Sequence, residues 1–124
     1  MWLNVTSLVG RATADPKQRE TVGGTKYATL RIAVPRGRGE TDFFTIELWG
    51  KLAAVAMNHV TRGVVVTVRA ELRQQTWVAD GSRRERVVVT ARSLGIIQNP
   101  VHDLGEVPDE STMDHEEPDS ELAA

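Results

Sequence analysis

The spacing of apolar residues changes from a period of two to a helical period within one stretch, residues 42–63. The first part alternates, so one face of a strand is apolar and the opposite face carries Phe43 and Trp49 among polar residues. After Gly50 the apolar residues recur at helical spacing and stop before Gly63, a residue favoured just past a helix C-terminus. The stretch predicts a strand followed by a short helix, with two large aromatics on the strand's outer face.

Four further segments predict strands, of which residues 24–34 and 64–73 alternate in the same way and predict half-buried sheet, while residues 85–97 are rich in Val. They cover residues 2–11, 24–34, 64–73 and 85–97. Trp2, in the first of them, is expected at the edge of the core or in a subunit contact.

Turn and loop signals separate these strands. Asp15-Pro16 marks a loop that extends to Glu20, and residues 35–41, PRGRGET, form a Gly-rich basic loop. Asp80-Gly81 predicts the turn of a long hairpin with Trp77 on its first arm. The prediction is an all-β chain of five strands with one short helix between the third and fourth. This is the order of an oligonucleotide/oligosaccharide-binding (OB) barrel, whose face and loops bind nucleic acid or sugars.

Charge is segregated along the chain and changes this picture. Residues 101–124 hold nine acids and no Lys or Arg, which leaves eight of the 17 acids against all 15 bases in residues 1–100. The body therefore carries a net charge of +7 and the tail −9. We expect one OB domain over residues 1–100 with a polyanion partner, and an acidic, disordered tail over residues 101–124.

Composition also bounds the location of the protein. The absence of Cys excludes disulfides and thiolate sites, so nothing indicates an oxidising compartment. The N-terminus lacks the pattern of a signal peptide, and no stretch approaches the roughly 18 apolar residues of a membrane span. A soluble, cytoplasmic protein without a membrane partner is expected.

Catalytic and metal chemistry find no support in the residue pattern. His59, His102 and His115 are too dispersed for a metal site, and His59 is expected to pack in the helix stripe or at an interface. Gly37-x-Gly39 lacks the third glycine and the helix of a nucleotide cradle. No catalytic constellation can be placed on one site, so we expect no enzyme activity, no metal and no cofactor.

At this point the order and spacing of several segments resemble the bacterial single-stranded DNA-binding protein (SSB) family. The segments that carry the resemblance are Leu8–Pro16, Gly23–Val34, Glu47–Gly63 and Val68–Trp77, followed by a Val-rich strand. The resemblance implies an OB-fold homotetramer that binds single-stranded DNA without sequence preference. It further implies a nucleoid-associated role in DNA replication, recombination or repair.

The resemblance also assigns site residues. It places base-stacking aromatics at Phe43, Trp49 and Trp77 and a backbone-contacting base at Lys51. We expect a phosphate-tracking groove because arginines are interleaved with these outward aromatics. The predicted DNA-binding arginines are Arg31, Arg36, Arg38, Arg69, Arg73, Arg84 and Arg86.

Two positions depart from the family pattern. A further stacking Trp of some members would fall near Arg38, where this chain has no aromatic. Family members commonly end in an acidic tip closed by an aromatic residue that recruits replication and repair enzymes, whereas this chain ends in Leu122-Ala123-Ala124. This departure puts that recruitment in doubt and suggests a specialised paralogue.

Two alternatives stay open on sequence alone. The same aromatic and basic face could hold single-stranded RNA, since recognition of a 2′-OH needs specific contacts that a sequence does not reveal. A sheet face that binds a protein would make the chain an OB-fold interaction module instead.

Overall fold

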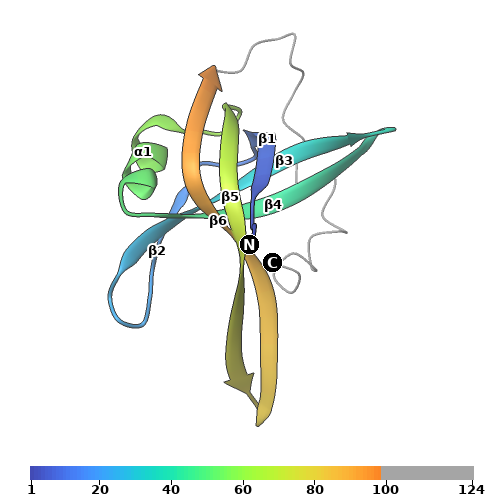
Figure 1. Ribbon diagram of the computed structural model, residues 1–124. Coiled ribbons are helices and arrows are strands. Elements are labelled where there is room, and N and C mark those ends of the chain that lie inside the picture. Colours follow the sequence, from blue (N-terminus) through green and yellow to red (C-terminus); the bar gives the residue numbers. More distant parts are fainter. Residues whose placement is uncertain (99–124) are drawn as a thin grey trace.

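The computed structural model describes residues 1–98 of the chain, which form six β-strands and one α-helix (Figure 1). The strands are β1 (Thr6–Ala12), β2 (Lys17–Glu20), β3 (Lys26–Gly37), β4 (Glu40–Trp49), β5 (Val65–Ala79) and β6 (Ser82–Gln98), and the helix is α1 (Lys51–His59). The predicted acidic tail, residues 101–124, and the predicted domain boundary at residue 100 lie outside the described residues.

Five of the strands close into a barrel. Hydrogen-bonded neighbours run in the order β1-β5-β6-β4-β3, and a further pairing of β1 with β3 joins the two ends. The β4–β6 pairing is parallel, and the other four are antiparallel. The predicted all-β OB barrel is confirmed, and α1 lies between β4 and β5, which are the third and fourth of the predicted strands.

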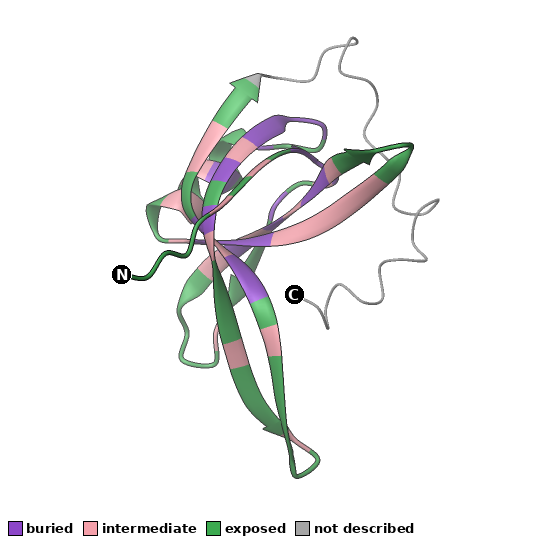
Figure 2. Ribbon diagram, turned by 45° about the vertical axis from the view of Figure 1, so that its right-hand side comes forward, coloured by how far each residue is buried: buried purple, intermediate pink, exposed green. Residues whose placement is uncertain are grey.

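The barrel is filled by the apolar faces that the alternation predicts. Ile46 and Leu48 are fully buried, as are Ala28, Leu30 and Ile32 on the neighbouring strand. From α1, Ala56 is buried, and Val60 follows it into the core just past the helix. Figure 2 shows this burial concentrated where the strands cross, with exposed residues toward the hairpin ends. His59 is exposed, so the expectation that it packs in the helix stripe is wrong, while a place at an interface stays a prediction.

The strand β2 corrects the prediction of a loop from residue 12 to residue 20. Lys17–Glu20 pairs with Lys26–Thr29 of β3 at the edge of the sheet. All four residues of β2 are charged or amide side chains and all are exposed. No alternation of apolar and polar residues therefore marks this strand, and charged side chains are typical of a protected sheet edge.

Both long hairpins turn on two residues with positive φ. Asp80 and Gly81 have φ of 53° and 76°, which confirms the predicted turn and fits the conformation that tight hairpins favour. Arg38 and Gly39 have φ of 58° and 79°, so the predicted loop at residues 35–41 is wrong. The strands β3 and β4 continue through that region and leave only these two residues as the turn. Both hairpins project from the barrel in Figure 1.

The N-terminal residues depart from the predicted strand. β1 begins at Thr6, and Trp2 is 95% exposed, so its placement at the core edge is wrong while a subunit contact stays a prediction. Asn4 lies before β1, yet its side chain bonds to Leu72, the residue that the β1–β5 register would place opposite it. Its Nδ2 donates to the Leu72 carbonyl oxygen at 2.8 Å, and its Oδ1 accepts from the Leu72 N–H at 2.9 Å.

Candidate nucleic-acid interface

The outer face of β3 and β4 holds a stacked aromatic pair. Register places Tyr27 of β3 directly opposite Trp49 of β4, and their ring centroids are 4.2 Å apart with an interplanar angle of 13°. The Trp49 Nε1–H donates to Oε1 of Glu47 at 3.3 Å, and Glu47 itself is only 8% exposed. Trp49 is therefore held in one orientation by a ring on one side and a carboxylate at its edge.

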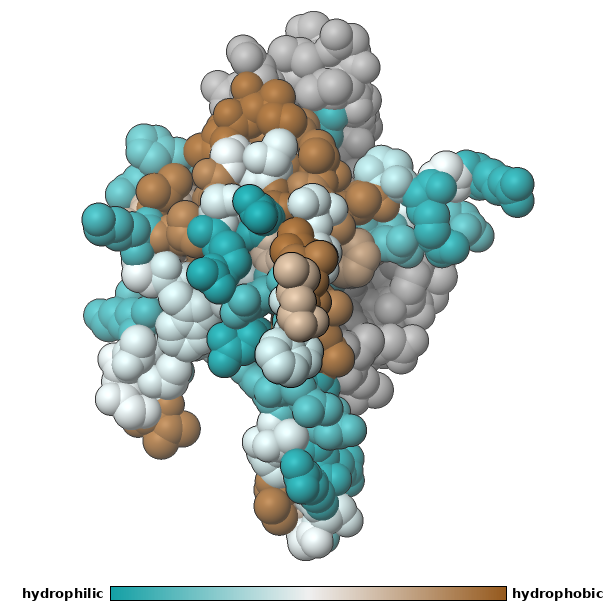
Figure 3. Space-filling view, in the orientation of Figure 1, coloured by the Kyte–Doolittle hydropathy of each residue, from teal (hydrophilic) through white to brown (hydrophobic). Residues whose placement is uncertain are grey.

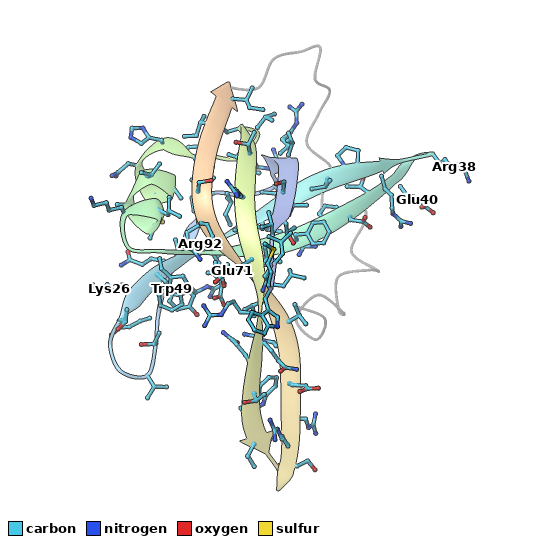
Figure 4. All side chains as sticks on the ribbon, viewed as in Figure 1. Lys26, Arg38, Glu40, Trp49, Glu71 and Arg92 are labelled. Carbon is cyan, nitrogen blue, oxygen red and sulfur yellow. The ribbon has the colours of Figure 1, made fainter. Side chains whose placement is uncertain are left out.

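An open groove of roughly 440 Å³ lies beside Trp49 on the outer face of β4, β6 and β5. Its lining consists of Glu47, Trp49, Glu71, Arg73, Gln74, Gln75, Val88, Thr90, Ala91 and Arg92. Figure 4 labels Trp49, Glu71 and Arg92, three of the lining residues, and each of them comes from a different strand. Two carboxylates and two guanidinium groups thus share the groove with one aromatic face.

Glu71 organises the two arginines of the groove. Its Oε1 is 2.9 Å from Nη1 of Arg92, and its Oε2 is 3.1 Å from Nη1 of Arg73. The position of Arg92 depends on a bulge: Ala70 pairs with Ala91 but Arg69 pairs with Ser93, which leaves Arg92 as the extra residue of β6. Bulges re-aim side chains, and this one brings a guanidinium over a carboxylate of the neighbouring strand.

Phe43 lies further along the same face of β4. The guanidinium carbon of Arg31 lies 4.7 Å from the centre of the Phe43 ring, within the range of a cation–π contact. The expected parity of this strand is confirmed, since Phe43 and Trp49 lie on the face opposite to the buried Ile46 and Leu48. One face of the Phe43 ring is covered by a cation that could also meet a phosphate.

Trp77 lies on β5 within the hairpin that projects from the barrel. It is 44% exposed and, with Gln75, Thr76 and Arg86, lines a shallow depression. The guanidinium carbon of Arg86 is 5.8 Å from the centre of the Trp77 ring, while Arg84 is its register partner on β6. A flat ring and two cations therefore share one stretch of the hairpin.

The remaining predicted site residues are more dispersed. Arg36 pairs with Glu40 at 3.1 Å and Asp42 at 3.2 Å near the β3–β4 turn, and Arg38 lies at the turn itself (Figure 4). Arg69 lines a second cleft with Asn4 and Glu71, and Lys51 is the exposed first residue of α1. The structure therefore groups Trp49 with Arg73, Trp77 with Arg84 and Arg86, and Phe43 with Arg31. It leaves Arg36 and Arg38 on a separate arm.

Figure 3 shows how hydrophilic and apolar side chains are distributed over one side of the molecule. Hydrophilic side chains follow both projecting hairpins, while apolar side chains gather over the upper part of the barrel in that view.

Sequence reasoning did not single out Tyr27, Thr90 or Arg92, and it assigned no site role to Glu47 or Glu71. Tyr27 shares the outward parity of Arg31, which is the one signal that could have found it. Its contact with Trp49 depends on register, and the role of Arg92 depends on a bulge.

Other site classes have no counterpart in the described residues. Within residues 1–98, no group of three or more His, Asp or Glu side chains could hold a metal ion. The same part of the chain has no helix long and apolar enough to cross a membrane.

Comparisons with known proteins agree with the architecture. The model of the single-strand binding protein family matches residues 3–97. A single-stranded DNA-binding protein of Thermotoga maritima is 31% identical over 126 residues, covering 94% of this chain and 89% of that protein. One of Thermosynechococcus vestitus is 37% identical over 79 residues, covering 62% of this chain and 66% of its own length. A solved structure described as the Plasmodium falciparum SSB complex with ssDNA has the same fold, with a TM-score of 0.64 at 21% identity, covering 79% of this chain and 97% of that one.

Proposed function

The chain belongs to the single-strand binding protein family, and from this membership we propose that it binds single-stranded DNA through base stacking and phosphate contacts. The observation that carries the proposal is that half-buried rings on one outer face and an exposed ring on one hairpin each lie beside guanidinium groups. Single-stranded nucleic acid needs flat surfaces for its bases and cations for its backbone, and neither requires a particular sequence.

Each predicted residue has a place in this proposal. Trp49, Trp77 and Phe43 supply stacking surfaces, and the cations beside each ring meet the adjacent phosphates. Lys51 follows Trp49 by two residues and extends the phosphate track toward α1. Arg36 and Arg38 lie on the β3–β4 arm and contact DNA that passes along it, while Arg69 serves the cleft beside Glu71.

The role that follows is protection of exposed single strands during DNA replication, recombination or repair. Such a role involves no catalysis and places the protein in the cytoplasm with the nucleoid. Recruitment of replication or repair proteins through the C-terminus is not part of the proposal.

Self-association, as a homotetramer by family resemblance, completes the proposal. Within the described residues, β1 pairs with β5 along its length but with β3 only at Arg11 and Ala12, so one edge of Thr6–Gly10 stays open. The residues around this edge include exposed apolar side chains, Trp2, Leu3, Val5 and Val9. An open strand edge with apolar neighbours is a surface on which another copy can pair. Sedimentation equilibrium tests this, and a monomer at micromolar concentration would contradict it.

One titration tests the DNA-binding proposal. Oligo(dT) should quench Trp fluorescence, double-stranded competitor should not reverse the quench, and oligo(rU) should compete more weakly. The slope of log K against log[salt] should be about −0.7 for each phosphate contacted, since cation release accompanies each contact. A slope near zero would exclude the phosphate track. Reversal of the Trp fluorescence quench by duplex DNA would exclude a preference for single strands.

A further inference from the structure

The groove beside Trp49 accepts a base from one side only. Tyr27 covers the Trp49 face that looks toward β3, and β4 lies between β3 and β6 in the sheet order. The free face of the ring therefore turns toward β6, and Trp49 lines the groove whereas Tyr27 does not. If Trp49 stacks a base, as the proposed function requires, that base lies in the groove.

The floor of this groove is a row of hydrogen-bond acceptors across three strands. Glu47 of β4 is opposite Thr90 of β6, and Thr90 is opposite Glu71 of β5. With neighbouring strands about 4.8 Å apart, the two carboxylate-bearing residues stand roughly 10 Å apart on either side of the threonine. This floor lies within reach of a ring stacked on Trp49.

Both carboxylates are fixed in position and keep acceptor capacity. Trp49 uses Oε1 of Glu47, and the two arginines use one oxygen each of Glu71. A carboxylate offers about four acceptor sites, so these contacts do not exhaust either group. Arg73 and Arg92 stand beside the floor, where they are placed to meet phosphates.

The chemistry of the floor selects among bases. Carboxylates repel phosphate, so the part of the nucleotide that meets them is the edge of the base. Cytosine presents an exocyclic amino group that Glu and Asp accept, whereas thymine and uracil present two carbonyl oxygens flanking a single N–H. A carbonyl oxygen against a carboxylate is unfavourable because both are acceptors.

We propose that the row Glu47–Thr90–Glu71 makes this groove a base-recognition subsite that favours bases with an exocyclic amino group over thymine and uracil. The inference rests on the proposed function and adds one selective position to an otherwise sequence-tolerant track. It assigns Glu47 and Glu71 a role in contacting bases. By charge alone, these two carboxylates would only repel the phosphates of a bound strand.

The test compares short oligo(dC) and oligo(dU), whose bases differ at the 4-position, at neutral pH, where cytosine is unprotonated and uracil keeps its N3 proton. Affinities are measured for the full chain by anisotropy of end-labelled oligomers. The variants are Glu47→Gln and Glu71→Gln, and the control is Glu20→Gln, an acid of equal charge on the exposed strand β2 outside the groove. Because Gln both donates and accepts, it removes the discrimination and keeps the shape.

We expect the ratio of oligo(dC) to oligo(dU) affinity to fall by about tenfold in the groove variants, as for loss of one specific base contact. The control should keep the wild-type ratio. Glu47 is 8% exposed, whereas the Glu71 side chain is 19% exposed, so Glu71→Gln carries the test if Glu47→Gln does not fold.

The outcomes separate the two proposals. If both affinities change by the same factor in the groove variants, the acids act only through charge or by holding Trp49 and the arginines, and the subsite is overturned. A wild-type chain that binds neither oligomer overturns the proposed function as well. Binding of both oligomers with an unchanged ratio overturns the subsite alone.

Discussion

Trp49→Ala should weaken both DNA binding and folding stability, whereas Trp77→Ala should weaken binding with little effect on stability. The difference follows from their surroundings. Trp49 stacks on Tyr27 at 4.2 Å and donates to the nearly buried Glu47, while Trp77 is 44% exposed with one cation 5.8 Å from its centre. The first ring is part of the packed structure and the second stands on a projecting hairpin.

The magnitudes can be set from these contacts. Loss of a stacked aromatic pair costs about 0.5–1.5 kcal/mol, and loss of a hydrogen bond to a charged acceptor costs about 1.5–3 kcal/mol. Trp49→Ala should therefore lower the free energy of unfolding by about 2–4.5 kcal/mol. An exposed cation–π contact contributes about 0.5–1 kcal/mol, which bounds the effect of Trp77→Ala. Each variant should lose about 1–3 kcal/mol of binding free energy, as for a base deprived of its stacking surface.

Urea unfolding followed by far-ultraviolet circular dichroism measures the stability of each variant. Anisotropy of labelled oligo(dT) measures binding without depending on the Trp signal, below the temperature at which either variant unfolds. Trp49→Phe serves as a matched control, since it keeps a stacking ring but removes the donor to Glu47. If Trp49→Ala is as stable as the wild type, the contacts with Tyr27 and Glu47 do not hold the ring. The inference that a base can stack on only one face of Trp49 would then be wrong.

Two further predictions concern the barrel closure and the acidic segment. Gly10→Ala would place a Cβ 2.8 Å from the Ala33 carbonyl oxygen, where β1 crosses β3, and should lower the free energy of unfolding by about 1–3 kcal/mol. Gly23→Ala, whose Cβ meets nothing nearer than 3.9 Å, should leave stability almost unchanged, and equal stabilities for the two variants would contradict the close crossing. A chain ending at Pro100 lacks nine acids and should bind oligo(dT) more tightly than the full chain at low salt, because a tethered polyanion competes at an effective concentration on the order of millimolar. Equal affinities of the two chains at low salt would refute this competition.

The barrel could be predicted because its signals are local. Alternation over residues 43–49 identifies the buried face of β4, and a helical period after Gly50 identifies α1. Asp80-Gly81 marks its turn because that pair accepts positive φ at little cost. Each of these patterns depends only on residues that lie within a few positions of one another in the sequence.

The strand β2 and the turn at Arg38 escaped prediction for a physical reason. An edge strand exposed on all four residues needs no apolar face, so nothing in KQRE distinguishes it from a loop. Arg38 takes a φ of 58°, which a basic side chain seldom adopts, and the Gly-rich composition around it indicates a loop as readily as a tight turn.

The parts of the site that sequence could not place depend on two bulges. Between Pro35 and Gly37 the β3–β4 register shifts by one residue, and this shift sets Tyr27 opposite Trp49. Without it, counting back from the turn would set Tyr27 opposite Gly50 and leave the Trp49 ring without its stacking partner. A slip of one residue also exchanges the two faces of a strand, so no periodicity in the sequence can specify it.

The second bulge determines the charge of the groove. Arg92 is the extra residue of β6, and its contact with Glu71 at 2.9 Å places a cation beside a carboxylate that would otherwise face DNA with Arg73 alone. Both bulges thus act beside one aromatic ring. The first places Tyr27 against the Trp49 face that looks toward β3, and the second pairs Arg92 with Glu71 in the groove beside Trp49. A binding face can therefore be anticipated from alternating aromatics and arginines, but its selectivity depends on single-residue shifts that are visible only in three dimensions.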